Sequence, residues 1–399
     1  MFTALTNNGQ TISLLTTPRE CFPSHYPPPY YCPACSQNVI LKKGTKRRWH
    51  FAHQSGSLCA YQSEPETEEH LAGKLVLYQW LKEKGLSPSV EAFISSIRRT
   101  ADVLFTWKNN SYALEFQCSS ISSEETIQRT KDYYSVGITP IWIFSLSRLR
   151  KMEGPRYVIH SFEWIGLRER RKDLRHAFIY FSPESSSFYY LFPRALPANS
   201  AVFGDVYTMP IIHTPIEHLI YLPNTLNGPL TWSANWMNQK KNWRFHTNQW
   251  RGKPDKTYMR QIFAKHRSDL PFFPSEAGWP SLSMEAFQTS SYIWQSWILL
   301  CFLPNIPLYQ RFSSRTICHE IHSLILNDNF IIRELPSISS PIEKAVFFYL
   351  ELLQRIGILK NTGAGWKKVK NIFLPISLED AFKMDKKWSN IIFYKGIVN

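Results

Sequence analysis

The stretch RTADVLFTWKNNSYALEFQ, residues 99–117, decides the fold that the sequence predicts. Two apolar segments flank residues 108–111, a pattern typical of two β-strands joined by a turn. Acidic residues are scarce in strands, yet Asp102 and Glu115 both lie inside these segments. Side chains alternate between the two faces of a strand, so Glu115 and Gln117 point the same way. We therefore expect three polar groups to converge on one spot above an apolar layer.

The segments around this hairpin predict an α/β core. Residues 63–85 place apolar side chains at helical spacing and end at Gly85, which can stop a helix. A strand is expected at residues 90–93, before the hairpin. A helix at 123–134 and a buried strand at 138–144 are expected after it. The predicted order of elements is therefore α-β-β-β-α-β.

The first predicted helix carries a polar stripe. Glu66, His70 and Lys74 recur every four residues, so they share one face of the helix. An amphipathic helix with an acidic first turn, which the helix dipole favours, would show the same pattern. The stripe is therefore a candidate for the rim of a site.

A metal-binding pattern lies nearer the N-terminus. Two cysteines form a C-x2-C knuckle, and an H-x2-H pair follows after fourteen residues. Zinc takes four soft or borderline ligands at tetrahedral corners, and a hairpin at residues 38–49 would return the second pair to the knuckle. Either histidine could instead be a polar surface residue on a basic loop. The predicted zinc ligands are Cys32, Cys35, His50 and His53, with Cys59 as the alternative ligand.

These features together resemble a known family. The order of elements, with Asp102 on the second strand and Glu115-x-Gln117 on the third, looks like the PD-(D/E)xK nuclease superfamily. The CPAC, HFAH, ETEEH and WIF segments narrow the resemblance to the competence protein CoiA family. That family is implicated in DNA processing during bacterial genetic transformation. The resemblance implies a restriction-endonuclease-like core in which Glu66 supplies an additional acid and Gln117 replaces the usual lysine.

The chemistry of phosphodiester hydrolysis fits the same residues. The reaction needs charge neutralisation at the phosphate and an activated water, which bound Mg²⁺ or Mn²⁺ would supply. Mg²⁺ prefers one or two carboxylates plus substrate oxygens, and His70 is a candidate for binding phosphate or assisting proton transfer. Lys74 and Arg129 are the candidates for restoring the missing positive charge. The predicted catalytic residues are Glu66, His70, Asp102, Glu115 and Gln117, with Asp102 and Glu115 holding the metal.

The composition favours a polyanionic partner. Lys and Arg number 46 against 31 Asp and Glu, which gives a formal net charge of +15. No run approaches the roughly 18 apolar residues of a membrane-spanning helix, and the start of the sequence lacks the features of a signal peptide. The seven cysteines are an odd count, unlike the paired cysteines typical of secreted chains. We expect a cytoplasmic protein without a membrane span.

Residues 231–253 place four tryptophans among five basic residues. Such a segment can form a platform on which bases of single-stranded DNA stack. It can also be a helix that buries its tryptophans while its basic side chains reach water, and this second interpretation is preferred. The candidate DNA contacts are Lys74, Arg129, Lys240, Lys241, Arg244 and Arg251.

The sequence predicts four regions. They are an N-terminal zinc-binding β-module at 1–62, the nuclease-like domain at 63–150, a basic, Trp-rich region at 151–280 and a helical domain at 281–399. Residues 271–282 are interpreted as a Pro-rich linker. A helical stretch at residues 341–359 followed by a basic β-segment resembles a winged helix, although plain helical packing is preferred.

The predicted function is metal-dependent hydrolysis of single-stranded or branched DNA during recombination. One alternative is a catalytically weak or inactive DNA-binding adaptor, and another is a scaffold for recombination proteins.

Overall fold

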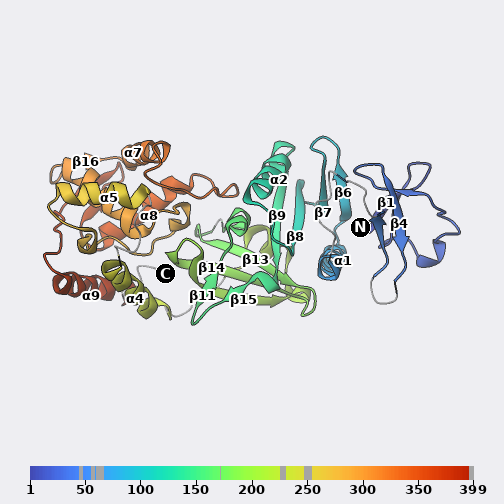
Figure 1. Cartoon of the computed structure of the whole chain (residues 1–399), viewed down its shortest axis with the longest axis horizontal. Helices are drawn as coiled ribbons and strands as arrows, with labels where there is room; N and C mark the ends of the chain where they lie inside the picture. The colour runs from blue at the N-terminus through green and yellow to red at the C-terminus, as the bar shows by residue number, and fades with distance from the viewer. Residues whose placement is uncertain are drawn as a thin grey trace. The chain divides into compact units, whose positions relative to one another are not determined.

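The computed structural model of the 399-residue chain forms two compact units (Figure 1). It describes all residues except 45–47, 55–58, 60–66, 171, 225–230, 247–253, 395–399 and the side chains of 254 and 394. The first unit comprises Met1–Leu149, Phe178–Tyr190 and Tyr207–Pro223. The second comprises Arg150–Ala177, Leu191–Val206 and Asn224–Asn399. The four regions expected from the sequence stay a prediction.

The first unit begins with a five-stranded sheet in the order β2-β1-β3-β4-β5. Its strands are β1 (Thr3–Leu5), β2 (Thr11–Ser13), β3 (Tyr30–Tyr31), β4 (Asn38–Lys42) and β5 (His50–His53). Strands β4 and β5 form the hairpin that the zinc pattern requires, with Lys42 opposite His50 and Val39 opposite His53. The core of this module contains Phe22, Tyr30 and Phe51, whose rings lie 5.1 to 6.3 Å apart between centroids.

The nuclease-like core follows in the predicted order α-β-β-β-α-β. Its elements are α1 (Glu68–Glu83), β6 (Ser89–Ile94), β7 (Arg99–Trp107), β8 (Asn110–Gln117), α2 (Ser123–Ser135) and β9 (Ile138–Ser145). Strands β6, β7 and β8 pair antiparallel, and β9 runs parallel to β8. On its other edge β9 pairs in parallel with β13 (His176–Ser182) through Phe144–Tyr180 and Phe181–Ser145. The predicted α/β fold class is confirmed.

The hairpin turn between β7 and β8 is tighter than the sequence predicted. Trp107 pairs with Asn110, so only Lys108 and Asn109 lie outside the strands. Both have positive φ, 47° and 62°, which suits the right-handed twist of the flanking strands. The turn fixes the register of the pairing, which continues as far as Val103 opposite Leu114.

Helix α1 approaches the sheet closely because of one glycine. The Thr67 side chain caps the helix by accepting from the backbone N–H of His70, and acidic residues fill the first turn. A Cβ on Gly73 would lie 2.1 Å from the Phe116 ring, so only glycine fits there. Phe116 therefore points to α1, while the next residue back, Glu115, bonds to α2. Since neighbouring strand residues face opposite sides, the two helices cover opposite faces.

The second unit combines short strands with helices. It contains β10 (Arg150–Lys151), β11 (Arg156–Val158) and β12 (Arg168–Glu169), and β14 (Ser187–Ala198) and β15 (Ala201–Pro210) belong partly to it. Its helices are α4 (Ser233–Phe245), α5 (Pro254–Lys265), α6 (Ser291–Trp297), α7 (Ser314–Leu326), α8 (Pro341–Arg355) and α9 (Leu378–Tyr394). A small antiparallel sheet has the order β16-β18-β17, with β16 (Arg311–Phe312), β17 (Leu359–Asn361) and β18 (Trp366–Lys368). The short α3 (Ile216–Tyr221) belongs to the first unit.

The segment interpreted as a linker is a buried part of the second unit. Every residue from 273 to 281 is buried, and Trp279 donates a hydrogen bond to the carbonyl oxygen of Ser275 at 2.7 Å. The prediction was wrong because Pro and Gly report that a segment is neither helix nor strand. They do not report whether it lies at the surface.

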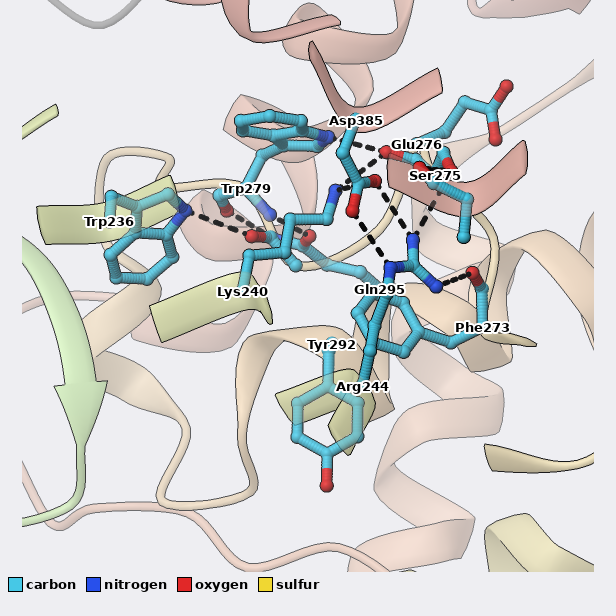
Figure 2. A network of polar contacts seen from close by, with 12 residues as sticks. Trp236, Lys240, Arg244, Phe273, Ser275, Glu276, Trp279, Tyr292, Gln295 and Asp385 are labelled. Carbon is cyan, nitrogen blue, oxygen red and sulfur yellow. Dashed lines mark hydrogen bonds and ion pairs between the residues drawn. The ribbon is translucent and has the colours of Figure 1, made fainter. Parts of the chain in front are cut away.

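Helix α4 buries its tryptophans, as the preferred interpretation of this segment predicted. Trp232, Trp236 and Trp243 are all buried, and the Trp236 indole N–H donates to the carbonyl oxygen of Gly278 at 3.1 Å (Figure 2). Residue 250, the fourth tryptophan, lies outside the described residues. The three described tryptophans of this segment therefore belong to the core and do not form a stacking platform.

Two of the predicted DNA contacts are buried beside these rings. Lys240 lies 3.1 Å and Arg244 2.8 Å from the carboxylate of Asp385, which α9 supplies (Figure 2). Lys240 also donates to the carbonyl oxygen of Ser275 at 2.8 Å. Burial lowers the pKa of Lys240 to about 7, although Asp385 opposes the shift. Neither cation can reach a phosphate, so their assignment as DNA contacts was wrong.

The two other candidate DNA contacts from residues 231–253 are Lys241 and Arg251. Lys241 is exposed, with its ammonium 5.4 Å from the centre of the Phe382 ring. Arg251 lies outside the described residues. Helical spacing separates the two lysines because neighbouring residues on a helix point about 100° apart.

Among the described residues no helix is long and apolar enough to cross a membrane.

Replacing Asp385 with Asn should strongly destabilise the protein. The change leaves Lys240 and Arg244 buried without their counter-charge, and breaking a buried pair in this way costs about 3–5 kcal/mol of the free energy of unfolding. Urea unfolding measures it. The control is Glu379→Gln, an exposed change of the same charge in the same helix, which should stay within about 0.5 kcal/mol of wild type. Equal stabilities of the two variants would contradict the role given to Asp385.

Candidate functional site

The N-terminal module brings four potential metal ligands together. The ligand atoms of Cys32, Cys35, His53 and Cys59 all lie within 4.8 Å of one another. Cys35 Sγ and His53 Nε2 are 3.3 Å apart. Three thiolates and one imidazole are a ligand set that zinc favours in structural sites, so the donors fit a zinc ion.

His50 is absent from this cluster, and its assignment as a ligand was wrong. It lies three residues before His53 on β5, and side chains on a strand alternate between faces. An H-x2-H pair on one strand therefore cannot face one ion. His50 Nδ1 instead donates to the carbonyl oxygen of Arg48 at 2.8 Å. Cys59, the alternative ligand, takes the fourth position.

Asp102 lies on β7 at the point where the pairing with β8 ends. The β7–β8 pairing ends at Val103 opposite Leu114, and Asp102 is the next residue of β7 beyond that last pair. Its Oδ2 accepts a hydrogen bond from the backbone N–H of Phe116 at 2.9 Å and lies 3.1 Å from Nε2 of His70. The carboxylate is thus held between a strand and helix α1.

The environment keeps Asp102 ionised. Burial on its own would raise its pKa, but His70, through charge and a hydrogen bond, outweighs burial together with the charges of Lys74 and Arg129. The pKa of Asp102 falls to about 2. Its side chain keeps 16% of its surface exposed. An ionised and partly accessible carboxylate can take a cation from solvent.

Glu115 has the opposite character. Its side chain is only 2% exposed, and both carboxylate oxygens are engaged by α2. Arg129 donates to Oε2 and the Tyr133 hydroxyl donates to Oε1. Burial raises the pKa of Glu115 to about 7 even though Arg129 opposes the shift. Two neighbouring carboxyl groups therefore differ widely in their affinity for a proton.

The structure separates the two cations that could replace the missing lysine. Lys74 is completely buried and lies 2.5 Å from Glu91, whose other oxygen accepts from the backbone N–H groups of Phe2 and Thr3. The assignment of Lys74 as a DNA contact was wrong. Helical spacing predicts on which face of the helix a side chain lies, but it does not predict how deeply that side chain is buried. Arg129 is the cation that lies beside Glu115, and its side chain is 22% exposed.

The two remaining site residues are less informative. The side-chain amide of Gln117 donates to the carbonyl oxygen of Ser119 at 2.9 Å and to its hydroxyl at 3.1 Å. It is therefore engaged by the following loop. Glu66 lies outside the described residues, so its role stays a prediction.

The carboxylates fit a divalent cation in part. Among the described residues only the cysteine–histidine cluster brings three or more ligand atoms within 4.8 Å of one another. His70, Asp102 and Glu115 therefore do not form a finished three-ligand site. Asp102 fits Mg²⁺ or Mn²⁺ as an ionised carboxylate, whereas Glu115 could join only by releasing Arg129 or Tyr133.

Tyr133 was missed by the sequence analysis, although a signal existed. Arg129 and Tyr133 are four residues apart on the predicted helix at 123–134, so they share one face. That face covers the side of the sheet to which Glu115 points. The spacing could have identified both residues as partners of the glutamate.

The fold and these residues define a nuclease-like protein with an N-terminal cysteine–histidine cluster. Comparison with protein families agrees with this class. Residues 66–223 match the competence protein CoiA nuclease-like domain. Residues 25–62 match the CoiA N-terminal domain, and residues 232–381 match the CoiA C-terminal domain.

A curated relative supports the same assignment. The competence protein CoiA of Bacillus subtilis (strain 168) is 28% identical over 340 residues, which cover 84% of this chain and 87% of the relative. No solved structure matches the chain significantly. With three domain matches that together span most of its length, the chain belongs to the competence protein CoiA family.

The cluster predicts one zinc ion per chain. Cys59→Ser should abolish or strongly weaken zinc binding because it removes a ligand, whereas His50→Ala should leave the zinc content at one. Elemental analysis of the purified full-length variants measures the stoichiometry. Loss of zinc in His50→Ala together with full zinc content in Cys59→Ser would contradict this ligand set.

Proposed function

We propose that this protein processes DNA during bacterial transformation. We further propose that its nuclease-like domain hydrolyses phosphodiester bonds of single-stranded or branched DNA with Mg²⁺ or Mn²⁺. The observation that carries the proposal is that two neighbouring strands of a nuclease-like domain carry the Asp102 and Glu115 carboxyl groups near enough for the charge of Asp102 to raise the pKa of Glu115. Their pKa values are shifted in opposite directions, as is common in active sites.

Each residue has a proposed task. A divalent cation held by Asp102 would neutralise charge on the phosphate and lower the pKa of a bound water. His70 orients Asp102 through their contact, and its proposed second task is to bind a phosphate oxygen. Arg129 supplies the positive charge that lysine supplies elsewhere in the superfamily. Glu115 sets the position of Arg129 and binds or releases a proton near neutral pH.

The positive net charge of the protein supports DNA as its proposed partner. A formal net charge of +15 favours association with DNA, and the proposed compartment is the cytoplasm. Recombination proteins are proposed as further partners, because DNA processed during transformation must be handed to recombination.

A second candidate is a DNA-binding adaptor with little or no catalytic activity. Two observations favour it. Both oxygens of Glu115 are already engaged, and Gln117 adds no positive charge where the superfamily has lysine. The two candidates differ in whether cleavage depends on Asp102.

Asp102→Asn should abolish metal-dependent cleavage while DNA binding persists. The change removes the charge that holds the cation but keeps the shape, and we expect a loss of about 100-fold or more in rate. The assay uses linear, single-stranded, flap and junction DNA with Mg²⁺ or Mn²⁺. The control is Thr106→Val, an exposed change on the same strand, which should cleave like wild type. If the wild-type protein bound these substrates and cleaved none, the adaptor would be the correct function.

Cleavage should also rise with pH through about 7. The Glu115 carboxyl is protonated below its raised pKa and ionised above it, and the reaction proposed here uses the ionised form. Tyr133→Phe removes a hydrogen bond that favours the ionised form, so the rise should move to higher pH. A pH–rate profile with saturating metal checks both statements. Identical profiles for wild type and Tyr133→Phe would contradict the role of Glu115.

A further inference from the structure

One face of the small β16-β18-β17 sheet consists of cations. Arg311 on β16 is paired with Lys367 on β18, and Lys367 is also paired with Lys360 on β17. Directly opposed residues of antiparallel strands point to the same face, so the three side chains form one line across the sheet, the cation row. Arg311 and Lys360 are exposed, and Lys367 is partly exposed.

The other face of the sheet is firmly anchored. Phe312, Leu359, Trp366 and Lys368 alternate with the cation row and are all buried. The Trp366 ring lies 5.9 Å from the ring of Phe347 on α8. The Lys368 ammonium donates to the carbonyl oxygen of Leu303 at 2.9 Å, so this lysine belongs to the interior. The cation row therefore stands on a rigid support.

Such a row destabilises the sheet unless an anion neutralises it. Side chains directly opposite each other have Cβ atoms about 4.5–5.5 Å apart, and like charges there repel. Within the described parts of the chain, no carboxylate lies within the 4.0 Å ion-pair distance of these three cations. A lysine on an edge strand can serve solubility alone. Lys367 is on the central strand, where this explanation does not apply.

An exposed aromatic side chain lies beside the middle cation of the row. Tyr309 is 64% exposed, and the Lys367 ammonium is 5.5 Å from the centre of its ring. The backbone N–H of Tyr309 donates to the carbonyl oxygen of Lys368 at 2.7 Å, which ties the aromatic residue to the sheet. Cations that follow a phosphate backbone beside an aromatic ring that stacks on a base are the usual parts of a single-strand site.

We propose that the cation row and Tyr309 bind single-stranded DNA, with phosphates on the row and a base stacked on the tyrosine. The row crosses two strand spacings, about 10 Å, which is room for about two or three consecutive phosphates. This inference rests on the proposed DNA-processing function and adds a binding surface outside the nuclease-like domain. It replaces the buried Lys240 and Arg244 as the place where the second unit meets DNA.

The test compares two full-length variants of equal charge. The row variant carries Arg311→Gln, Lys360→Gln and Lys367→Gln. The control removes three exposed lysines elsewhere in the same unit, Lys265, Lys383 and Lys386, by changing each to Gln. The probe is a single strand of about 20 thymidines, which exceeds the roughly 4–16 nucleotides of a typical site.

The row variant should bind about 100-fold more weakly than wild type in about 0.1 M salt. The slope of log affinity against log salt should fall in magnitude by about 2, because each lost phosphate contact removes about 0.7. The control should keep the affinity within a few-fold and the slope unchanged. Tyr309→Ala should lose about fivefold or more, whereas Tyr309→Phe should keep wild-type affinity because it still stacks.

The outcomes separate this surface from the nuclease site. Asp102→Asn should lose cleavage yet retain the affinity that depends on the cation row. If wild type bound the strand and the row variant matched the control in affinity and slope, the surface would be refuted while DNA processing stood. If wild type bound no DNA even at low salt, the proposed function and the surface would both be wrong.

Discussion

The hydrogen-bonded register of β7 and β8 is the constraint on which the candidate site depends. A two-residue turn at Lys108 and Asn109 fixes it, and it brings Asp102 of β7 within hydrogen-bond reach of Phe116, which follows Glu115 on β8. The backbone N–H of Phe116 then holds the Asp102 carboxylate, and the Phe116 side chain packs on Gly73 so that His70 approaches the same oxygen. A shift of one residue would reverse the face to which each side chain of β8 points and would separate Glu115 from Arg129 and Tyr133.

The pKa values of the two carboxyl groups differ because the two side chains lie in different surroundings. Asp102 is partly exposed beside His70 and stays ionised, whereas Glu115 is enclosed by α2 and holds its proton more tightly. The arrangement is compatible with catalysis, because a poised pair of titratable groups is what acid–base chemistry uses. It is also compatible with a site that only stabilises the fold, because Arg129 and Tyr133 both bind the carboxylate of Glu115.

Much of the nuclease-like core could be predicted from the sequence, because its signals are periodic and local. Alternation in residues 99–117 and helical spacing in the flanking segments gave each element to within a few residues. The features that could not be predicted depend on how deeply individual side chains are buried. Lys74, Lys240 and Arg244 read as basic surface residues, and only tertiary packing shows that each is buried against a carboxylate. The Pro-rich segment at 271–282 failed for the same reason.

Direct observation of the cation tests the proposed metal site most sharply. Crystals of the full-length protein soaked in Mn²⁺ and measured by anomalous diffraction should show Mn²⁺ bound by the carboxylate of Asp102, and Asp102→Asn crystals should lack it. Zinc at the cysteine–histidine cluster, distinguished by its own absorption edge, serves as the internal control. Zinc density at the cluster with no Mn²⁺ at Asp102 would contradict the proposed nuclease chemistry.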